Sequence, residues 1–379
     1  MNGRGDGGDV HSPRVADAQL VFLHVPKTAG TTIRGIAYAH YGEARIAPIY
    51  PGESMYLGIE EFASLPEALR DRADLVIGHV MFGFHRHLSG KRPFRYATML
   101  RDPIRRCASL YDHFASIQFH GAAPALPGLL EGPEGIQFNN HQTRTLSGMP
   151  APLGKCPRAM LDKAKENIEQ AFVFLGITEL FEESLLLAGA ALGWPLRPYE
   201  TRNVSAQNPG WRLHQMTETA EKTNLDRLEE MNSLDRELYD YARGRFLAQL
   251  QSTVPDWQVQ LVNFRQRLAN SPVSAMRAVG SLAPLQPNRV AGWSKLVGRD
   301  LPTRVRIEIA GRQPQTVPAL LKRDDLRAAS VHFASACGFV LDLPADATLR
   351  QGDRVRAFNA DTGQELGNSP RILEEEAVA

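Results

Sequence analysis

Two short stretches of the chain carry residues suited to holding phosphate groups. The first, HVPKTAGTT (His24–Thr32), follows an apolar run and combines Lys27 with Thr28, Thr31 and Thr32. A loop between a buried strand and a helix presents free N–H groups and the positive end of the helix dipole. Lys27 adds a charge and the threonines add hydroxyls. The stretch favours a 5′-phosphate or phosphosulfate; the alternative is an ordinary strand–helix turn with a solvated lysine.

The second stretch, LRDPIRRCASLYDH, forms another junction between a strand and a helix. Asp102 and Pro103 are typical of an N-cap and a first helical position, with Arg101 just before them and Ser109 about two turns on. An arginine fork and a hydroxyl can hold a second phosphate. Taken alone, the arginine is equally compatible with a surface ion pair. Neither stretch has the G-x-x-x-x-G-K-[ST] spacing of a nucleoside triphosphate site.

Together, the two stretches resemble the sulfotransferases that use 3′-phosphoadenosine 5′-phosphosulfate (PAPS). VPKTAGTT is similar to the carbohydrate branch, most of all to the heparan sulfate and dermatan/chondroitin 2-O-sulfotransferases. GHVMFGF (Gly78–Phe84) matches the G-H-V segment of that family, and residues 159–187 resemble its helix–strand–helix. The resemblance covers residues 19–250 and leaves residues 289–379 outside.

The resemblance implies a role for individual residues. His79 stands at the position of the catalytic base. A loop that closes over the nucleotide corresponds loosely to YETRNVSAQN, with Thr201, Arg202 and Asn203. The donor would be PAPS and the product the 3′,5′-bisphosphate PAP. The implied nucleotide-binding residues are Lys27, Thr28, Ala29, Gly30, Thr31 and Thr32 for the 5′-phosphosulfate, and Arg101 and Ser109 for the 3′-phosphate.

These residue types suit sulfuryl transfer without a metal. A histidine with a pKa near neutrality can take the proton of an acceptor hydroxyl as it attacks. Lys27 and the helix N-terminus can stabilise the charge on the leaving oxygen, which makes Lys27 a catalytic residue as well. His79, His85 and His87 lack a cysteine or carboxylate partner, so no metal site is expected. The heparan sulfate enzymes carry a second histidine where this chain has Ile77.

The basic stretch HRHLSGKRPFR (His85–Arg95) has two interpretations. It is about equally typical of a solvated loop and of a groove wall for an anionic glycan. In the second case His85, Lys91 and Arg92 would bind the substrate, and Arg144 and Lys155 could join them.

Alternating strands and helices predict an α/β fold, a P-loop-type parallel sheet flanked by helices. Apolar strands are expected at Gln19–Val25, Ala73–Val80, Phe94–Pro103 and Phe172–Glu179. Helices are expected at residues 31–42, 103–117, 159–171, 180–193, 217–231 and 233–250.

The character of the sequence changes after about residue 265. Short alternating runs broken by Gly, Pro and Asp predict a small all-β domain of the sandwich type. The expected division is a disordered tail at 1–18, a sulfotransferase domain at 19–265, a linker at 266–288 and a β-sandwich-like accessory domain at 289–379.

Composition restricts the setting. With 43 Lys and Arg against 42 Asp and Glu, the net charge of +1 does not indicate nucleic acid or a membrane surface. Three scattered cysteines fit a reducing cytoplasm, and no signal peptide or membrane anchor is evident. The chain therefore looks like a soluble bacterial relative acting on a carbohydrate acceptor; its oligomeric state stays open. The alternatives are a P-loop nucleotide kinase and a non-catalytic protein that binds nucleotide or glycan.

Overall fold

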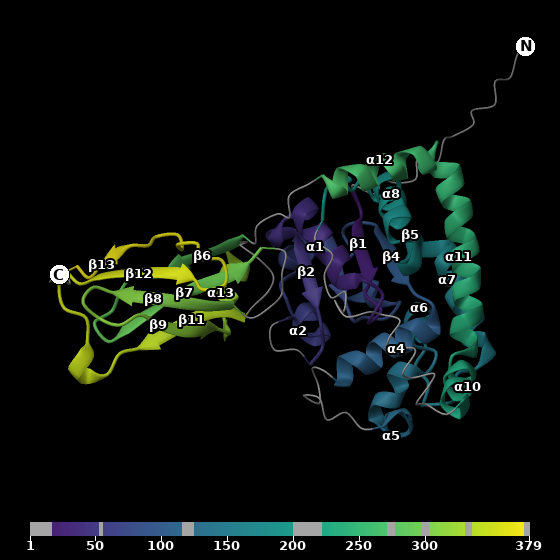
Figure 1. The fold of residues 1–379 in the computed structure, drawn as a ribbon, viewed down its shortest axis with the longest axis horizontal. Helices are drawn as coiled ribbons and strands as arrows, with labels where there is room; N and C mark the ends of the chain where they lie inside the picture. Colours follow the sequence, from purple (N-terminus) through teal and green to yellow (C-terminus); the bar gives the residue numbers. More distant parts are fainter. Residues whose placement is uncertain are drawn as a thin grey trace, which may run out of the picture.

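The computed structural model describes residues 17–52, 56–115, 125–199, 222–270, 277–297, 303–329 and 336–374. Figure 1 shows two parts, an α/β part and a part made mainly of strands. The strands are β1 (Gln19–Leu23), β2 (Ile46–Ile49), β3 (Leu75–Gly78), β4 (Phe94–Leu100), β5 (Phe172–Ile177), β6 (Ala278–Leu282), β7 (Arg289–Leu296), β8 (Thr303–Ile309), β9 (Gln315–Ala319), β10 (Leu321–Lys322), β11 (Ala336–Asp342), β12 (Arg354–Asn359) and β13 (Arg371–Ile372). The helices are α1 (Gly30–Tyr41), α2 (Ile59–Ala63), α3 (Glu67–Arg72), α4 (Pro103–His113), α5 (Leu126–Glu131), α6 (His141–Ser147), α7 (Arg158–Ala171), α8 (Phe181–Leu192), α10 (Lys222–Met231), α11 (Ser233–Thr253), α12 (Trp257–Ala269) and α13 (Asp324–Ala328).

The first five strands form one parallel sheet in the order β2-β3-β1-β4-β5. The register pairs Leu23 with Gly78 and with Thr98, and Ile49 with Gly78. The strands therefore end close to one level, and their carboxyl ends share one edge. This sheet, with its flanking helices, confirms the predicted α/β architecture.

Within the parallel sheet, edge strand β2 is the one that the sequence pattern did not predict. It is only four residues long and contains Pro48. Proline cannot donate a hydrogen bond to a ladder and is tolerated at sheet edges, so IAPI does not have the pattern of a strand. The predicted strands at β1, β3, β4 and β5 are confirmed, with ends that differ by a few residues.

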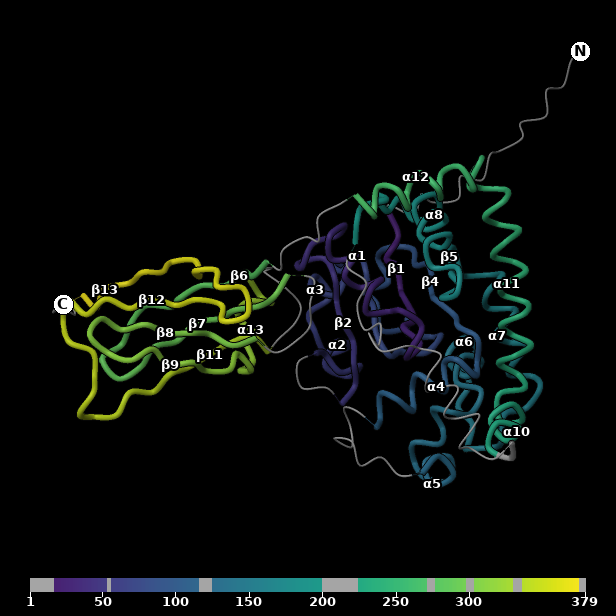
Figure 2. The backbone as a smooth tube through the Cα atoms, in the orientation of Figure 1, coloured from purple at the N-terminus to yellow at the C-terminus, as the bar shows by residue number. Residues whose placement is uncertain are grey.

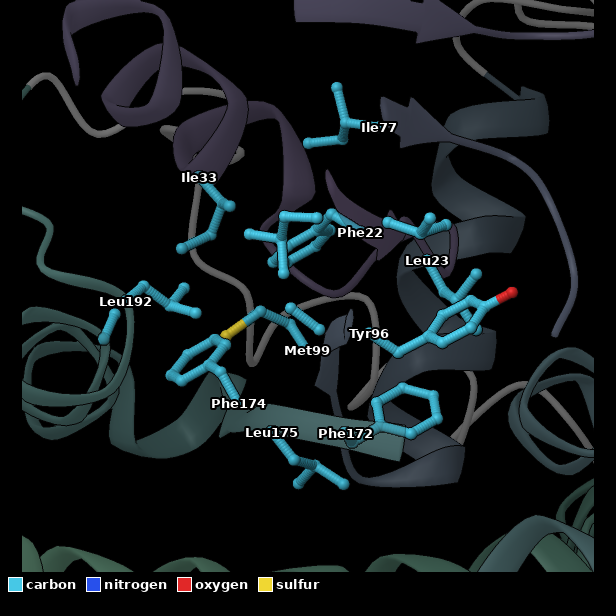
Figure 3. Close-up of a cluster of buried hydrophobic side chains, with 14 of the residues drawn as sticks. Phe22, Leu23, Ile33, Ile77, Tyr96, Met99, Phe172, Phe174, Leu175 and Leu192 are labelled. Atoms are coloured by element: carbon cyan, nitrogen blue, oxygen red, sulfur yellow. The ribbon is translucent and has the colours of Figure 1, made fainter. Parts of the chain in front are cut away.

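A continuous apolar core lies between the sheet and its helices. Figure 3 shows side chains of β1, β3, β4 and β5 in one cluster with Ile33 of α1 and Leu192 of α8. Phe22, at the centre of the sheet, has no exposed surface. Burying such a side chain contributes about 1.5–3 kcal/mol to stability. This core fixes the strand ends that carry the site.

The C-terminal part contains two four-stranded antiparallel sheets, ordered β10-β11-β7-β6 and β13-β12-β8-β9. One apolar cluster takes residues from both, such as Val290 and Phe339 from the first and Ile307 and Val355 from the second. This arrangement is that of a sandwich. Strand β6 falls within the stretch expected to be a linker, so that stretch is structured in part.

Specific contacts join the two parts. Lys295 of β7 pairs with Glu43, and its ammonium lies 4.7 Å from the ring centroid of Tyr38 on α1. Arg327 of α13 reaches Glu61 of α2 at 3.3 Å, and its carbonyl accepts a hydrogen bond from Arg72. The β part therefore contacts the β2 side of the sheet, as Figure 2 also shows. No helix within the described ranges is long and apolar enough to cross a membrane.

Candidate active site

A row of polar residues follows the strand ends of the parallel sheet. In sheet order, the residue directly after each strand is Tyr50, His79, His24, Arg101 and Thr178. The carboxyl edge of a parallel sheet is where α/β proteins commonly bind ligands. Two of these residues are histidines, two carry hydroxyl groups, and Arg101 carries a permanent positive charge.

The loop between β1 and α1 has an unusual backbone. Lys27 and Ala29 both adopt positive φ, at 70° and 65°, although neither is glycine. Ala29 is the N-cap of α1, and no side chain caps that helix end. The first N–H groups of a helix lack partners within the helix and suit an anion. The backbone of this loop is therefore strained, which is typical of ligand-binding sites.

The threonines of this loop do not all have the predicted role. The hydroxyl of Thr28 donates to the carbonyl of Val25 at 2.8 Å and is almost fully buried. Its proton is thus used inside the loop, which corrects the expectation of a hydroxyl donor for the phosphosulfate. Thr31 and Thr32 lie in the first turn of α1, with Thr32 buried and Thr31 half-buried.

Gly30 permits a close approach between α1 and His24. A Cβ atom at Gly30 would lie 1.9 Å from Cδ2 and 2.0 Å from Nε2 of the His24 ring. Only glycine fits there without displacing the imidazole. The predicted importance of Gly30 therefore has a packing reason in this structure.

His24, Tyr50 and His79 form a cluster of rings. The ring centroids of His24 and His79 lie 4.9 Å apart, and those of Tyr50 and His79 lie 4.7 Å apart. Nδ1 of His24 is 2.8 Å from the hydroxyl of Tyr50. The guanidinium of Arg34, on α1, lies 4.9 Å from the Tyr50 ring centroid. His79 is thus placed beside two rings from the neighbouring strands.

The electrostatics keep the cluster neutral. His79 is exposed, yet crowding by protein atoms, and then the charges of Arg34 and His113, lower the pKa of His79 to about 4. Burial, followed by His79, Arg34 and Lys27, lowers the pKa of His24 well below 6.5. Both imidazoles are therefore unprotonated at pH 7, so His79 can accept a proton.

Lys27 and Arg101 lie together. Arg101 Nη1 donates to the carbonyl of Lys27 at 3.0 Å, which joins the two predicted phosphate-binding stretches. Burial, then Arg101, lowers the pKa of Lys27, and Asp112 partly offsets this. The strongest electrostatic neighbour of Lys27 is thus another cation, as expected where an anion is to be bound.

Arg101 is held by residues that the sequence did not single out. Gln142 of α6 accepts from the Arg101 N–H at 2.9 Å and donates to its carbonyl at 2.8 Å. Glu179 lies 4.0 Å from Arg101 Nε and accepts from the N–H of Asp102. The predicted N-cap is confirmed, because Asp102 accepts from Arg105 N at 2.9 Å. Ser109 is half-buried on the second turn of α4.

Two further histidines influence the site. His113, at the end of α4, lowers the pKa of His79, while its own pKa is lowered by burial and then by Lys27. His141, at the start of α6, has its pKa lowered to about 3 by burial, then by Arg106 and His79. Nothing in their sequence spacing links either residue to His79; only the fold does.

The predicted acceptor-binding residues lie elsewhere. Arg92 precedes β4 and donates to Asp74, before β3, at 2.9 Å and to the carbonyl of Asp17, before β1. Lys91 pairs with Glu67 at 2.9 Å. Both residues therefore lie at the amino edge of the sheet, opposite His79. The structure does not bring them into the site, because the segment that contains them leads back to the start of β4.

His85 and Arg144 also have structural partners. The His85 ring stacks on Phe94, with centroids 4.1 Å apart, and its Nδ1 is 2.9 Å from the Tyr96 hydroxyl. Arg144 is buried and donates to Asn139 and to the carbonyl of Pro152. Their nitrogens are used within the protein, so these side chains do not form the predicted groove wall. Lys155 lies in the loop before α7.

The predicted nucleotide clamp, Thr201, Arg202 and Asn203, lies outside the described residues. Within the described ranges, no three His, Cys, Asp or Glu side chains are grouped so that they could hold a metal ion.

Comparison with known proteins identifies the family. The sequence model of the galactose-3-O-sulfotransferase family matches residues 9–306. The chain belongs to this family. The match contains the whole parallel sheet and its site, and it extends through β6 and β7 into β8.

Individual relatives are carbohydrate sulfotransferases. Heparan-sulfate 6-O-sulfotransferase 2 of Gallus gallus is 27% identical over 62% of this chain and 68% of its own length. Heparan-sulfate 6-O-sulfotransferase 1 of Homo sapiens is 29% identical over 61% of this chain and 66% of its own length. Galactose-3-O-sulfotransferase 3 of Mus musculus is 26% identical over 77% and 73%. The predicted membership of a carbohydrate sulfotransferase family is thus confirmed.

Proposed function

We propose that this protein transfers the sulfuryl group of PAPS to a hydroxyl of a carbohydrate acceptor, with His79 as general base. One observation supports this most strongly. The hydrogen bond from Arg101 to the carbonyl of Lys27 joins the two phosphate-binding stretches at the edge that also holds His79. A donor with a 3′-phosphate and a 5′-phosphosulfate needs two such sites side by side.

Each residue has a defined part in this proposal. The N–H groups at the start of α1, from Ala29 to Thr31, would bind the 5′-phosphosulfate together with Lys27. Arg101 and Ser109 would bind the 3′-phosphate. Neutral His79 would take the acceptor proton, while Lys27 stabilises the charge that develops on the leaving oxygen. Negative donor phosphates beside Lys27 would also raise the pKa of His79 from about 4, which makes it a stronger base.

The acceptor is proposed only by class. The relatives named above differ in the sugar and in the position that their names give, so we propose a carbohydrate hydroxyl and no particular position. A bacterial source and a special likeness to the 2-O-sulfotransferases stay predictions. A cytoplasmic location also stays a proposal, based on three free cysteines.

Ligand-dependent melting tests the donor. PAP at about a hundred times its Kd should stabilise the protein by about 2.7 kcal/mol, whereas ATP with Mg²⁺ should have little effect. Stabilisation by ATP with Mg²⁺ and none by PAP would instead favour a nucleotide kinase.

His79→Ala tests the base. This variant should keep its stabilisation by PAP and lose sulfuryl transfer from PAPS in an acceptor screen. His87→Ala is the matched control. The backbone carbonyl of His87 accepts a hydrogen bond from Arg70, and the residue lies away from the carboxyl ends of the strands. Full activity in His79→Ala would exclude His79 as the base.

A further inference from the structure

We propose that His24 and Tyr50 are positioning residues for His79 and connect it to the donor-binding end of α1. The inference rests on the proposed function, because it takes His79 as the group that accepts the proton. His24 begins the HVPKTAGTT stretch but had no predicted role, and Tyr50 belongs to no motif found in the sequence. Both stand at strand ends on either side of the strand that carries His79, since β3 lies between β2 and β1.

The His24 ring is held on two sides. It is 7% exposed, and its Nδ1 lies within hydrogen-bond distance of the Tyr50 hydroxyl, at 2.8 Å. On the other side its Cδ2 and Nε2 atoms lie against Gly30, where no Cβ would fit. A buried imidazole with one fixed hydrogen bond and one tight backbone contact has little freedom to rotate.

His79 lies beside the two residues of this pair. Its backbone N–H donates to the carbonyl of Ile49 at 3.0 Å, directly before Tyr50. Its ring meets Tyr50 nearly edge-on, at an interplanar angle of 76°, and meets His24 at 51°. The two rings therefore restrict the rotamers of a side chain that is otherwise exposed. A general base must be held in a narrow range of positions to take a proton efficiently.

Helix α1 contacts both members of the pair. Gly30 lies on His24 at the N-terminus of the helix, and Arg34, one turn later, lies over the Tyr50 ring. Any shift of α1 when an anion binds at its N-terminus is thus passed to the two rings that orient His79. This gives donor binding a direct physical route to the base.

Tyr50→Phe removes the hydroxyl that contacts His24 and keeps the ring that meets His79. We expect kcat to fall about tenfold, with the KM for PAPS within twofold, since misplacing a catalytic group costs rate rather than donor affinity. Tyr41→Phe is the matched control: its hydroxyl accepts a hydrogen bond from Trp194 at 3.2 Å but lies at the far end of α1. Unchanged kcat in Tyr50→Phe would overturn the role of the hydroxyl.

A second pair of variants tests His24. His24→Asn keeps a polar group near the position of Nδ1, and His24→Leu removes it, so Asn should retain more activity than Leu. Equal activity of both variants and the wild type would overturn the proposal.

NMR separates this proposal from the proposed function. Tyr50→Phe should shift the His79 ring resonances, and PAP should shift them in the wild type but less in Tyr50→Phe; Tyr41→Phe should behave as the wild type. If the His79 ring resonances do not change in Tyr50→Phe, the positioning role is overturned. If the wild type and all variants lack sulfuryl transfer but these shifts are present, the proposed function is rejected and the contact between Tyr50 and His79 stands.

Discussion

The charged residues at the two edges of the parallel sheet have different kinds of neighbours. At the amino edge, Asp74 receives Arg45 at 2.6 Å and Arg92 at 2.9 Å, so opposite charges are paired within the protein. At the carboxyl edge, Lys27 has Arg101 as its strongest electrostatic neighbour, and the loop between β1 and α1 holds two residues at positive φ. Paired charges stabilise a fold, whereas clustered cations and backbone strain are typical of a binding site.

This comparison also explains why the basic stretch at residues 85–95 was misleading. Sequence shows that cations are close together, but not whether carboxylates from other elements neutralise them. At the amino edge, Arg92 forms an ion pair with Asp74, and Lys91 forms one with Glu67. Whether a cluster of cations can bind a ligand therefore depends on which carboxylates the fold brings to it.

Replacing one lysine at each edge should give the largest contrast. We expect Lys27→Ala to lower kcat/KM for PAPS by about 10²–10³-fold, because a charge that stabilises the leaving group is lost. Lys91→Ala should leave the kinetics unchanged, since its exposed pair with Glu67 lies at the opposite edge. Steady-state kinetics with varied PAPS and varied acceptor check both variants. A raised acceptor KM in Lys91→Ala would break the comparison and restore the groove.

A glycine at each edge gives the next contrast. Gly30→Ala should lower the free energy of unfolding by about 3 kcal/mol, because the new Cβ would collide with the buried His24 ring. Gly90→Ala, in the loop before β4, should cost about 1 kcal/mol, since Gly90 has φ of 78° but open space around it. Urea unfolding measures both. Equal losses would show that the His24 ring moves aside easily.

Stability should fall on acidification because of His24. Its folded pKa is lowered well below the unfolded value of 6.5, so the unfolded chain takes up the proton first as pH falls. The contribution is complete above about pH 6.5 and is lost towards the folded pKa, with a slope of up to about 1.4 kcal/mol per pH unit. Urea unfolding at pH 7.5 and 5 should show a smaller loss for His24→Asn than for the wild type. Parallel losses would remove His24 as a cause.

The smallest effect is expected at Ala29. Ala29 has φ of 65°, so replacement by glycine should relieve backbone strain, while the greater entropy of the unfolded chain opposes this gain. The net result should be an increase of about 0.5 kcal/mol in the free energy of unfolding. Differential scanning calorimetry should show a slightly higher Tm and PAP binding close to that of the wild type. A clear destabilisation would mean that the Ala29 methyl group packs usefully in this loop.

Several features of the fold were predictable from local patterns. The buried apolar runs that became β1, β3, β4 and β5 stand out because both faces of a parallel sheet are covered. The start of α4 was predictable from Asp102 and Pro103, whose capping geometry is a local property. Strand β2 was not predicted because Pro48 is atypical of a strand, and the position of Tyr50 directly after it was therefore not predicted either.

The candidate site divides in the same way. By itself, the sequence determined the loop around Lys27, the arginine before α4 and the histidine after β3, because these signals depend on neighbours along the chain. Only the tertiary structure decided which residues meet. The sheet order put His24 and Tyr50 on either side of His79, and gave Lys91 and Arg92 acidic partners at the other edge. Contacts between strands distant in sequence depend on sheet order and register, which no local pattern contains.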